Sequence, residues 1–255
     1  MKLVISASPH IDSGATTRKI MGDVLIALCP ALIAAVIIFG WRALLVTAVC
    51  AAACVFFEWG FEKLCHKPST IDDLSAVVTG VILAYNLPVS IPLWQAVFGC
   101  LVAIVAVKQL FGGIGKNFLN PALAGRAILL ASYASVMAGN WVKVGEKALV
   151  VGSNADIVTA ATPMMLMKGV DAAGWETLTS TYTLGDMFIG RIGGSLGEVS
   201  SLMLLLGGIY LLLRKVISWQ TPVAFIATVA VISLISAPAG ISGVEYMAYN
   251  VFGGG

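Results

Sequence analysis

One short polar segment holds the residue types that could carry a covalent modification. Residues 156–163 read Asp-Ile-Val-Thr-Ala-Ala-Thr-Pro. A hydroxyl that a second protein is to modify must be accessible, and the two alanines before Thr162 leave space around its side chain. The same residues also fit the start of a helix, with Thr162 as N-cap and Pro163 at the first helical position. The pattern alone therefore predicts either a modified threonine or an ordinary helix cap.

The spacing in this segment resembles the flavin-attachment signature. That signature is an aspartate, two variable residues, a serine or threonine, a small residue, an alanine and a final threonine. Asp156, Thr159, Ala160, Ala161 and Thr162 occupy its five defined positions. In proteins with the signature, a separate transferase joins FMN through its phosphate to the last threonine. The resemblance therefore implies a phosphoester-linked FMN on Thr162, with Asp156 and the small residues serving recognition and access.

A second threonine-rich segment, residues 12–17, does not have this spacing. It contains Ser-Gly-Ala-Thr, but Asp12 directly precedes the serine, and His10 stands where the aspartate is required. We expect this segment to be a polar cap at the start of a helix, and we do not expect Thr16 to carry the flavin.

The elements that position these residues are predicted to be membrane-spanning helices. Hydrophobic residues make up 59% of the 255 residues and charged residues only 11%, against about 25% charged in soluble globular domains. The mean hydropathy is +0.95. Nucleic-acid binding, which requires dense lysine and arginine, is excluded. The composition predicts an all-α, multi-pass membrane protein in contact with lipid.

Apolar runs predict seven spans and the start of an eighth. They cover residues 21–39, 42–59, 74–87, 92–107, 121–138, 199–213 and 221–237, and the eighth begins near residue 246. We therefore expect a five-span unit over residues 1–137, a flavin-bearing loop over residues 138–198, and the start of a second unit over residues 199–255. Because the chain ends in an apolar run, we expect two or three further helices after it.

The distribution of lysine and arginine predicts the orientation. With a cytoplasmic N-terminus, only Arg42 falls in a short outer loop. Nine such residues fall inside: Lys2, Arg18, Lys19, Lys63, Lys67, Lys108, Lys116, Arg214 and Lys215. The loop of residues 138–198 is then extracytoplasmic. Since five spans precede it, a repeated unit would enter from the opposite side, which is the pattern of an inverted-repeat helix bundle.

Two segments are unusual for spanning helices. The apolar run of residues 74–87 is short for a membrane span. Residues 111–126 contain three glycines followed by Asn120 and a proline. Irregular backbone at membrane depth is tolerated where it is buried in protein or lines a cavity. We expect these short, broken helices to meet near the membrane core and line a cavity, with Asp72, Asp73 and Asn120 on an ion pathway. An ordinary cytoplasmic turn is the alternative interpretation of the glycine-rich segment.

The remaining charges near the spans have simpler predicted roles. Arg126, one turn inside the fifth span, is expected to hold a flavin phosphate or a carboxylate. Solvated positions at span ends are expected for Asp23, Glu58, Asp186 and Glu198. The cysteines, Cys29, Cys50, Cys54, Cys65 and Cys100, are expected to be small buried hydrophobic residues, because no further metal ligands accompany them.

Four segments in order resemble the RnfD family of Rnf-complex membrane subunits, which is related to the NqrB component of the sodium-pumping NADH:quinone reductase. They are residues 8–21, 111–126, 156–162 and 194–200. Two departures stand out. Ala160 replaces a frequent glycine, and the last helices of the family's second repeat are absent. The short N-terminal arm favours the Rnf protein over its quinone-reductase relative.

This resemblance implies a multi-subunit oxidoreductase and translocase of the prokaryotic inner membrane. Such a complex moves electrons between reduced ferredoxin and NAD and couples this to Na+ or H+ translocation. It implies other Rnf subunits and a flavin transferase as partners, FMN as cofactor, and room for a second, non-covalent flavin such as riboflavin. The chain has neither a CxxC iron–sulfur framework nor a GxGxxG fingerprint, so a complete active site is not expected on it.

Two other functions fit the sequence less fully. A channel or secondary transporter built from inverted repeats would need no flavin, and a purely structural membrane protein would tolerate the loss of Thr162. The sequence does not decide between Na+ and H+, since carboxylates and carbonyls serve both.

Overall fold

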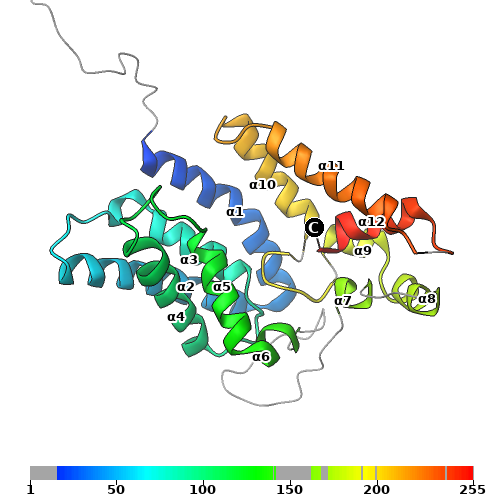
Figure 1. Cartoon of the computed structure of the whole chain (residues 1–255), viewed down its shortest axis with the longest axis horizontal. Helices are drawn as coiled ribbons and strands as arrows, with labels where there is room; N and C mark the ends of the chain where they lie inside the picture. Colours follow the sequence, from blue (N-terminus) through cyan, green and yellow to red (C-terminus); the bar gives the residue numbers. More distant parts are fainter. Residues whose placement is uncertain are drawn as a thin grey trace, which may run out of the picture.

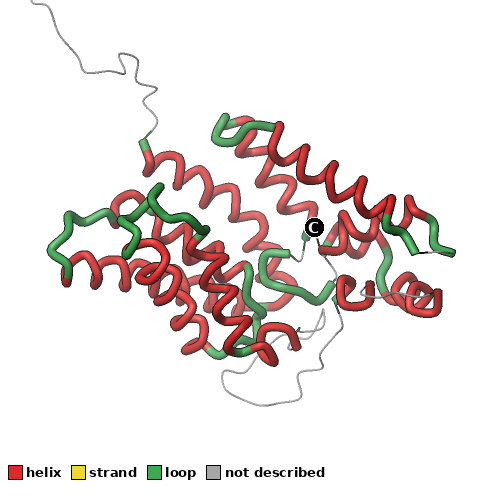
Figure 2. Tube along the Cα trace, viewed as in Figure 1, coloured by secondary structure: helices red, strands yellow, loops and turns green. Residues whose placement is uncertain are grey.

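The structure is a computed structural model that describes residues 16–139, 141, 162–167, 172–190, 192–198, 200–238 and 240–254. Figure 2 shows helices joined by loops, and these described residues contain no strand. The all-α class expected from composition is therefore confirmed. The inverted-repeat relation between the two units stays a prediction.

Two long helices open the described chain. α1 (Thr17–Phe39) and α2 (Trp41–Leu64) are each long and apolar enough to cross a membrane. Gly40, with φ of 82°, separates them. Thr16 caps α1, because its Oγ1 accepts a hydrogen bond from the backbone nitrogen of Lys19 at 3.3 Å. The first two spans agree with the sequence, and Thr16 has the expected capping role.

The next helices are short. α3 (Ser75–Tyr85) follows a 3-10 turn, Ile71–Asp73, and α4 (Leu93–Leu101) continues as a π-helix over Val102–Gln109. Their positions match the third and fourth expected spans. The π-helix was not expected, because apolar periodicity does not distinguish a π-helix from an α-helix.

The fifth expected span is two helices. α5 (Pro121–Ser132) ends before α6 (Ala134–Gly139), with Tyr133 between them at φ −133° and ψ 49°. The Tyr133 ring packs edge-on against Trp94, with ring centroids 5.4 Å apart. Hydropathy cannot detect such a break, because Tyr133 is as compatible with an apolar run as its neighbours.

Six helices make up the rest of the described chain. They are α7 (Pro163–Met167), α8 (Ala172–Thr181), α9 (Leu184–Ile189), α10 (Ser201–Leu213), α11 (Gln220–Ile235) and α12 (Gly243–Gly254). The last three agree with the sixth, seventh and eighth expected spans. The first three lie in the polar segment, and they share a small core with α12 formed by Met167, Leu178, Met187, Ile192 and Tyr249.

Helix α1 joins two groups of helices (Figure 1). On one side it packs against α2, and on the other against α10. The α1–α10 contact is close, because a Cβ atom added to Gly207 would lie 2.2 Å from the carbonyl oxygen of Ala27. An ion pair between Asp23 and Arg214, 3.1 Å apart, lies on the same contact. Glycine at position 207 therefore allows the two helix groups to pack together.

Candidate functional site

Thr162 lies directly before helix α7 and is half-buried. Its carbonyl oxygen accepts a hydrogen bond from the backbone nitrogen of Leu166 at 3.2 Å, and Pro163 is the first helical residue. The helix-start interpretation of the motif is therefore correct for the backbone, and it leaves modification of the hydroxyl untested. Asp156, Thr159 and Ala161 lie outside the described residues.

A cavity of about 430 Å³ adjoins Thr162. This volume is within the range of about 300–1,000 Å³ that is usual for small-molecule sites. Segments far apart in the sequence form its wall, and its lining includes Arg126, Leu130, Met137, Trp141, Met164 and Glu198. The cavity thus combines apolar surface with one arginine and one glutamate.

Arg126 connects this cavity to helix α3. Its Nη1 donates a hydrogen bond to Oδ1 of Asn86 at 2.7 Å and lies 3.7 Å from Oε1 of Glu198. The Arg126 and Glu198 side chains are 34% and 46% exposed. Arg126 therefore lines the same cavity as Thr162. A guanidinium there can pair with an oxyanion through several donors.

The carbonyls at the end of α3 are paired by a segment from the other half of the chain. The backbone nitrogens of Leu196 and Gly197 donate to the carbonyl oxygens of Leu87 and Tyr85, at 3.1 and 2.8 Å. A Cβ atom on Gly197 would lie 2.6 Å from Cβ of Tyr85. A helix as short as α3 can therefore end inside the protein with its backbone paired. Gly197 is the one sequence signal that could have indicated this close approach.

A second cavity, of about 450 Å³, lies at the other end of α3. Ser75, Val78, Thr79 and Ile82 line it from α3, and residues 114–115 and 117–121 line it from the glycine-rich break. The expected meeting of these two segments around a cavity is confirmed, whereas its depth in a membrane is not tested.

Of the three residues proposed for the ion pathway, only Asn120 is among the described residues that line this cavity. Asn120 lines it and caps α5 through a hydrogen bond from the Ala122 nitrogen at 3.0 Å. Asp73 accepts a hydrogen bond from the Ser75 nitrogen at 2.7 Å, at the start of α3. Asp72 is exposed. Asn120 and Asp73 thus have structural roles, and an ion-pathway role of the three residues stays a prediction.

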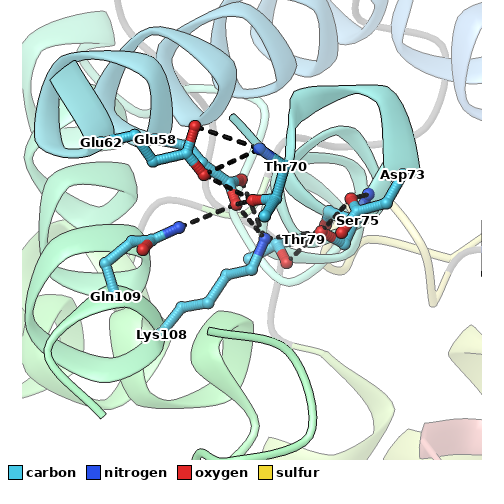
Figure 3. A network of polar contacts seen from close by, with 8 residues as sticks. All are labelled: Glu58, Glu62, Thr70, Asp73, Ser75, Thr79, Lys108 and Gln109. Carbon is cyan, nitrogen blue, oxygen red and sulfur yellow. Dashed lines mark hydrogen bonds and ion pairs between the residues drawn. The ribbon is translucent and has the colours of Figure 1, made fainter. Parts of the chain in front are cut away.

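Beside this cavity lies a buried ion pair that the sequence did not indicate (Figure 3). Lys108 Nζ lies 2.7 and 2.8 Å from the two carboxylate oxygens of Glu58, and it donates to Oγ of Ser75 at 2.6 Å. The Glu58 and Lys108 side chains are 0% and 3% exposed. The expectation of a solvated Glu58 is therefore wrong, because a partner 50 residues later in the chain compensates its charge.

Three further polar residues belong to this network. Gln109 Nε2 donates to Glu58 Oε1 at 2.8 Å. The Thr70 hydroxyl lies between two carboxylates, 2.5 Å from Oε1 of the buried Glu62 and 3.0 Å from Oε1 of Glu58, and the Thr70 nitrogen also donates to Glu62 at 3.1 Å. Lys108 and Gln109 are consecutive, yet both point at Glu58 (Figure 3). The π-helix that contains them has a wider turn than an α-helix, and such turns are frequent at functional sites.

Other charges are also buried against expectation. Arg42, counted as the one cation of the short outer loops, donates through Nε to the Val89 carbonyl at 2.8 Å and through Nη2 to the Ile91 carbonyl at 3.1 Å. Arg42 therefore hydrogen-bonds backbone carbonyls of the loop between α3 and α4. Asp23 accepts hydrogen bonds from Tyr210 and Arg214 and is also buried, not solvated.

The cysteines divide into two groups. Cys50, Cys54 and Cys100 are buried as expected, whereas Cys29 and Cys65 are exposed. The Cys100 thiol lies 3.5 Å from the Cys50 carbonyl oxygen. Among the described residues, no group of three or more histidine, cysteine, aspartate or glutamate side chains is arranged to hold a metal ion.

Comparisons with known proteins match nearly the whole chain. The model of the NQR2, RnfD, RnfE family matches residues 4–255. The D-subunit of the Na(+)-translocating ferredoxin:NAD(+) oxidoreductase complex of Acetobacterium woodii is 45% identical over 92% of this chain and 70% of its own length. The D-subunit of the proton-translocating ferredoxin:NAD(+) oxidoreductase complex of Clostridium ljungdahlii is 39% identical over 90% of this chain and 68% of its own length.

A third relative carries a less specific name. The D-subunit of the ion-translocating oxidoreductase complex of Marinobacter nauticus is 35% identical over 92% of this chain and 70% of its own length. The family model matches residues 4–255, which include the segments 111–126 and 194–200 that carried the resemblance in the sequence. The chain belongs to the NQR2, RnfD, RnfE family of membrane subunits.

Proposed function

We propose that this chain is the RnfD component of a membrane complex that couples electron transfer between reduced ferredoxin and NAD to Na+ or H+ translocation. We further propose that it carries FMN, joined through a phosphoester to Thr162. The two relatives named for Na+ and for proton translocation support the first part. The other subunits of the complex and a flavin transferase are the partners that this function requires.

The observation that carries the flavin proposal is the position of Thr162 on the wall of a cavity that also contains Arg126. The motif assigned the threonine from its spacing alone, and the arginine lies 36 positions earlier. The two residues gather at one cavity of suitable volume, which is what a flavin attached to Thr162 would need.

The lining residues fit a flavin phosphodiester. An ester between FMN and Thr162 retains one negative charge, and the Arg126 guanidinium can pair with it. Trp141 and the methionines of the lining offer apolar surface to a planar ring. When bound, the flavin would supply one- or two-electron transfer, while the protein orients it and tunes its electrostatic surroundings.

The proposed orientation places this cavity outside the cytoplasm. It follows from the lysine and arginine distribution and is tested by labelling of a cysteine introduced at position 168 in intact cells. Labelling without permeabilisation is expected, and labelling only after permeabilisation would contradict this orientation.

Intact-mass spectrometry of the chain, purified from its complex, tests the attachment. Thr162→Ala should lose the mass of one FMN and the flavin fluorescence of the denatured chain, because no hydroxyl remains for the ester. Thr16→Ala is the matched control and should retain both. An adduct that persists in Thr162→Ala, or that disappears in Thr16→Ala, would refute the assignment. A wild-type chain without any flavin would favour the transporter alternative.

A further inference from the structure

Helix α3 contacts a cation from another helix at each of its ends. At its start, Ser75 Oγ accepts from Lys108 Nζ at 2.6 Å. Directly after its last residue, Asn86 Oδ1 accepts from Arg126 Nη1 at 2.7 Å. The second contact is at the cavity that holds Thr162, and it makes Asn86 the residue through which α3 meets that cavity.

The Asn86 amide has a fixed orientation. Its Nδ2 donates to the carbonyl oxygen of Ile82, one turn earlier, at 2.8 Å. Because the amide nitrogen only donates and the amide oxygen only accepts, this bond directs Oδ1 toward Arg126. The guanidinium is thus held by a side chain that is itself held by the helix backbone.

The end of α3 that carries Asn86 is also held in place. The backbone nitrogens of Leu196 and Gly197 pair with the carbonyls on both sides of Asn86. Within the helix, a Cβ atom on Gly80 would lie 2.7 Å from the backbone of Ala51, so α3 and α2 are in backbone contact. Close packing of this kind leaves Asn86 little freedom to move relative to α2.

Glu198 is a weaker partner for Arg126. Its Oε1 lies 3.7 Å from Nη1, 1.0 Å farther than the Asn86 oxygen, and its side chain is 46% exposed. A half-exposed ion pair at this distance adds little to the ordering of a flexible arginine. The position of the guanidinium therefore depends mainly on Asn86.

We propose that Asn86 is a positioning residue that holds the Arg126 guanidinium at the Thr162 cavity and thereby sets the redox potential of the flavin. This inference rests on the proposed attachment of FMN to Thr162. A fixed cation beside a flavin stabilises the reduced form, which carries more negative charge. A guanidinium released from Asn86 spreads over several rotamers and its stabilising effect falls.

The test is a redox titration of the Thr162 flavin in the whole purified complex. Asn86→Leu should retain the covalent flavin and lower its midpoint potential, with the oxidised-to-reduced equilibrium shifted about tenfold, which is about 30 mV for a two-electron couple. Arg126→Gln should lower the potential at least as far. The double variant should show no more than the Arg126→Gln shift, because Asn86 acts through Arg126.

The matched control is Asn250→Leu. Asn250 on α12 makes the same intrahelical bond, from Nδ2 to the Tyr246 carbonyl at 2.8 Å, and among the described contacts it has no arginine partner. Its replacement should leave the potential unchanged. If Asn86→Leu does not assemble, Asn86→Ala removes the same acceptor with a smaller side chain and is expected to give the same shift.

The outcomes separate the two proposals. A covalent flavin whose potential is unchanged in both Asn86 variants, or shifts of Asn86→Leu and Arg126→Gln that add, would overturn the role of Asn86 alone. A wild-type chain that lacks covalent flavin would overturn both this role and the attachment to Thr162.

Discussion

The two ends of helix α3 hold ion pairs of opposite character. At the start of the helix, Lys108 and Glu58 are 2.7 Å apart with side chains 3% and 0% exposed. Near its end, Arg126 and Glu198 are 3.7 Å apart with side chains 34% and 46% exposed. One short helix therefore lies between a buried polar network (Figure 3) and the cavity that Thr162 lines.

The difference indicates which of the two cations has hydrogen-bond donors left for an anion, since Lys108 also lines a cavity. The Lys108 ammonium has three donors, and Glu58 and Ser75 already accept from it. Arg126 has five donors, and its described contacts use Nη1 alone. The buried pair thus holds α2, α3 and the π-helix together, whereas the open pair has donors left for an anion.

Loss of the buried pair should have the largest effect on stability. Lys108→Met leaves the Glu58 carboxylate, whose side chain is 0% exposed, without its cation, and breaking a buried pair in this way costs about 3–5 kcal/mol. We expect a large fall in the unfolding temperature of the detergent-solubilised protein. Lys63→Met is the control, because Lys63 is exposed above the Trp59 ring and its loss should change this temperature little.

A double variant sharpens this result. Replacing Glu58 by Gln together with Lys108→Met removes both charges, so it should recover much of the stability lost in the single variant. A single variant as stable as wild type would mean that the buried pair does not hold the helices, and the contrast with the Arg126 end would then be wrong.

Loss of the Asp23–Arg214 pair between α1 and α10 should lower the unfolding temperature by an amount between those for the buried pair and the open pair. The carboxylate side chain is 10% exposed and the arginine 44%. Asp23→Asn keeps an acceptor for Tyr210 but loses the charge, so we expect a smaller fall in unfolding temperature than for Lys108→Met. Because the arginine is open to solvent, the difference from wild type should shrink as the salt concentration rises.

Thermal unfolding at low and high salt measures this effect. Tyr210→Phe removes one hydrogen bond to Asp23 but leaves the ion pair with Arg214, so it is the matched control and should show a weaker salt dependence. If the fall in unfolding temperature caused by Asp23→Asn did not depend on salt, the Asp23–Arg214 pair would behave as a buried ion pair.

The sequence predicts the positions of the apolar helices well because hydropathy depends on local composition. The bounds of α1, α10 and α11 agree with the expected spans to within a few residues. Hydropathy gave no sign of the break at Tyr133 or of the π-helix, because both depend on packing against other helices. The short length of α3 was predicted, because few residues separate the polar residues on its two sides.

The charges show where sequence reasoning fails. Glu58, Lys108 and Arg42 lie at the ends of apolar runs, which is where solvated charges are also found, and their burial depends on partners 47 or more residues away. The resemblance to the flavin-attachment signature singled out Thr162 without such information, and its modification stays a prediction. Asn86 has no sequence signal beyond being a polar residue in a short apolar run, and its contact with Arg126 required the three-dimensional arrangement.

Of these substitutions, Glu198→Gln should change the unfolding temperature least. Because the side chain is 46% exposed and 3.7 Å from Arg126, Glu198→Gln should cost less than about 1 kcal/mol. The same change removes a negative charge from the wall of the proposed flavin cavity, so it should raise the flavin midpoint potential, opposite to the shift expected for Asn86→Leu. Asp186→Asn is the control, because Asp186 lies in the first turn of α9, accepts from the Thr183 hydroxyl at 2.6 Å and is not among the residues that line this cavity. Titration of the flavin and thermal unfolding of the same preparation check both effects. If Glu198→Gln lowered the unfolding temperature as far as Lys108→Met, the Arg126 end of α3 would be as closed as the Glu58 end.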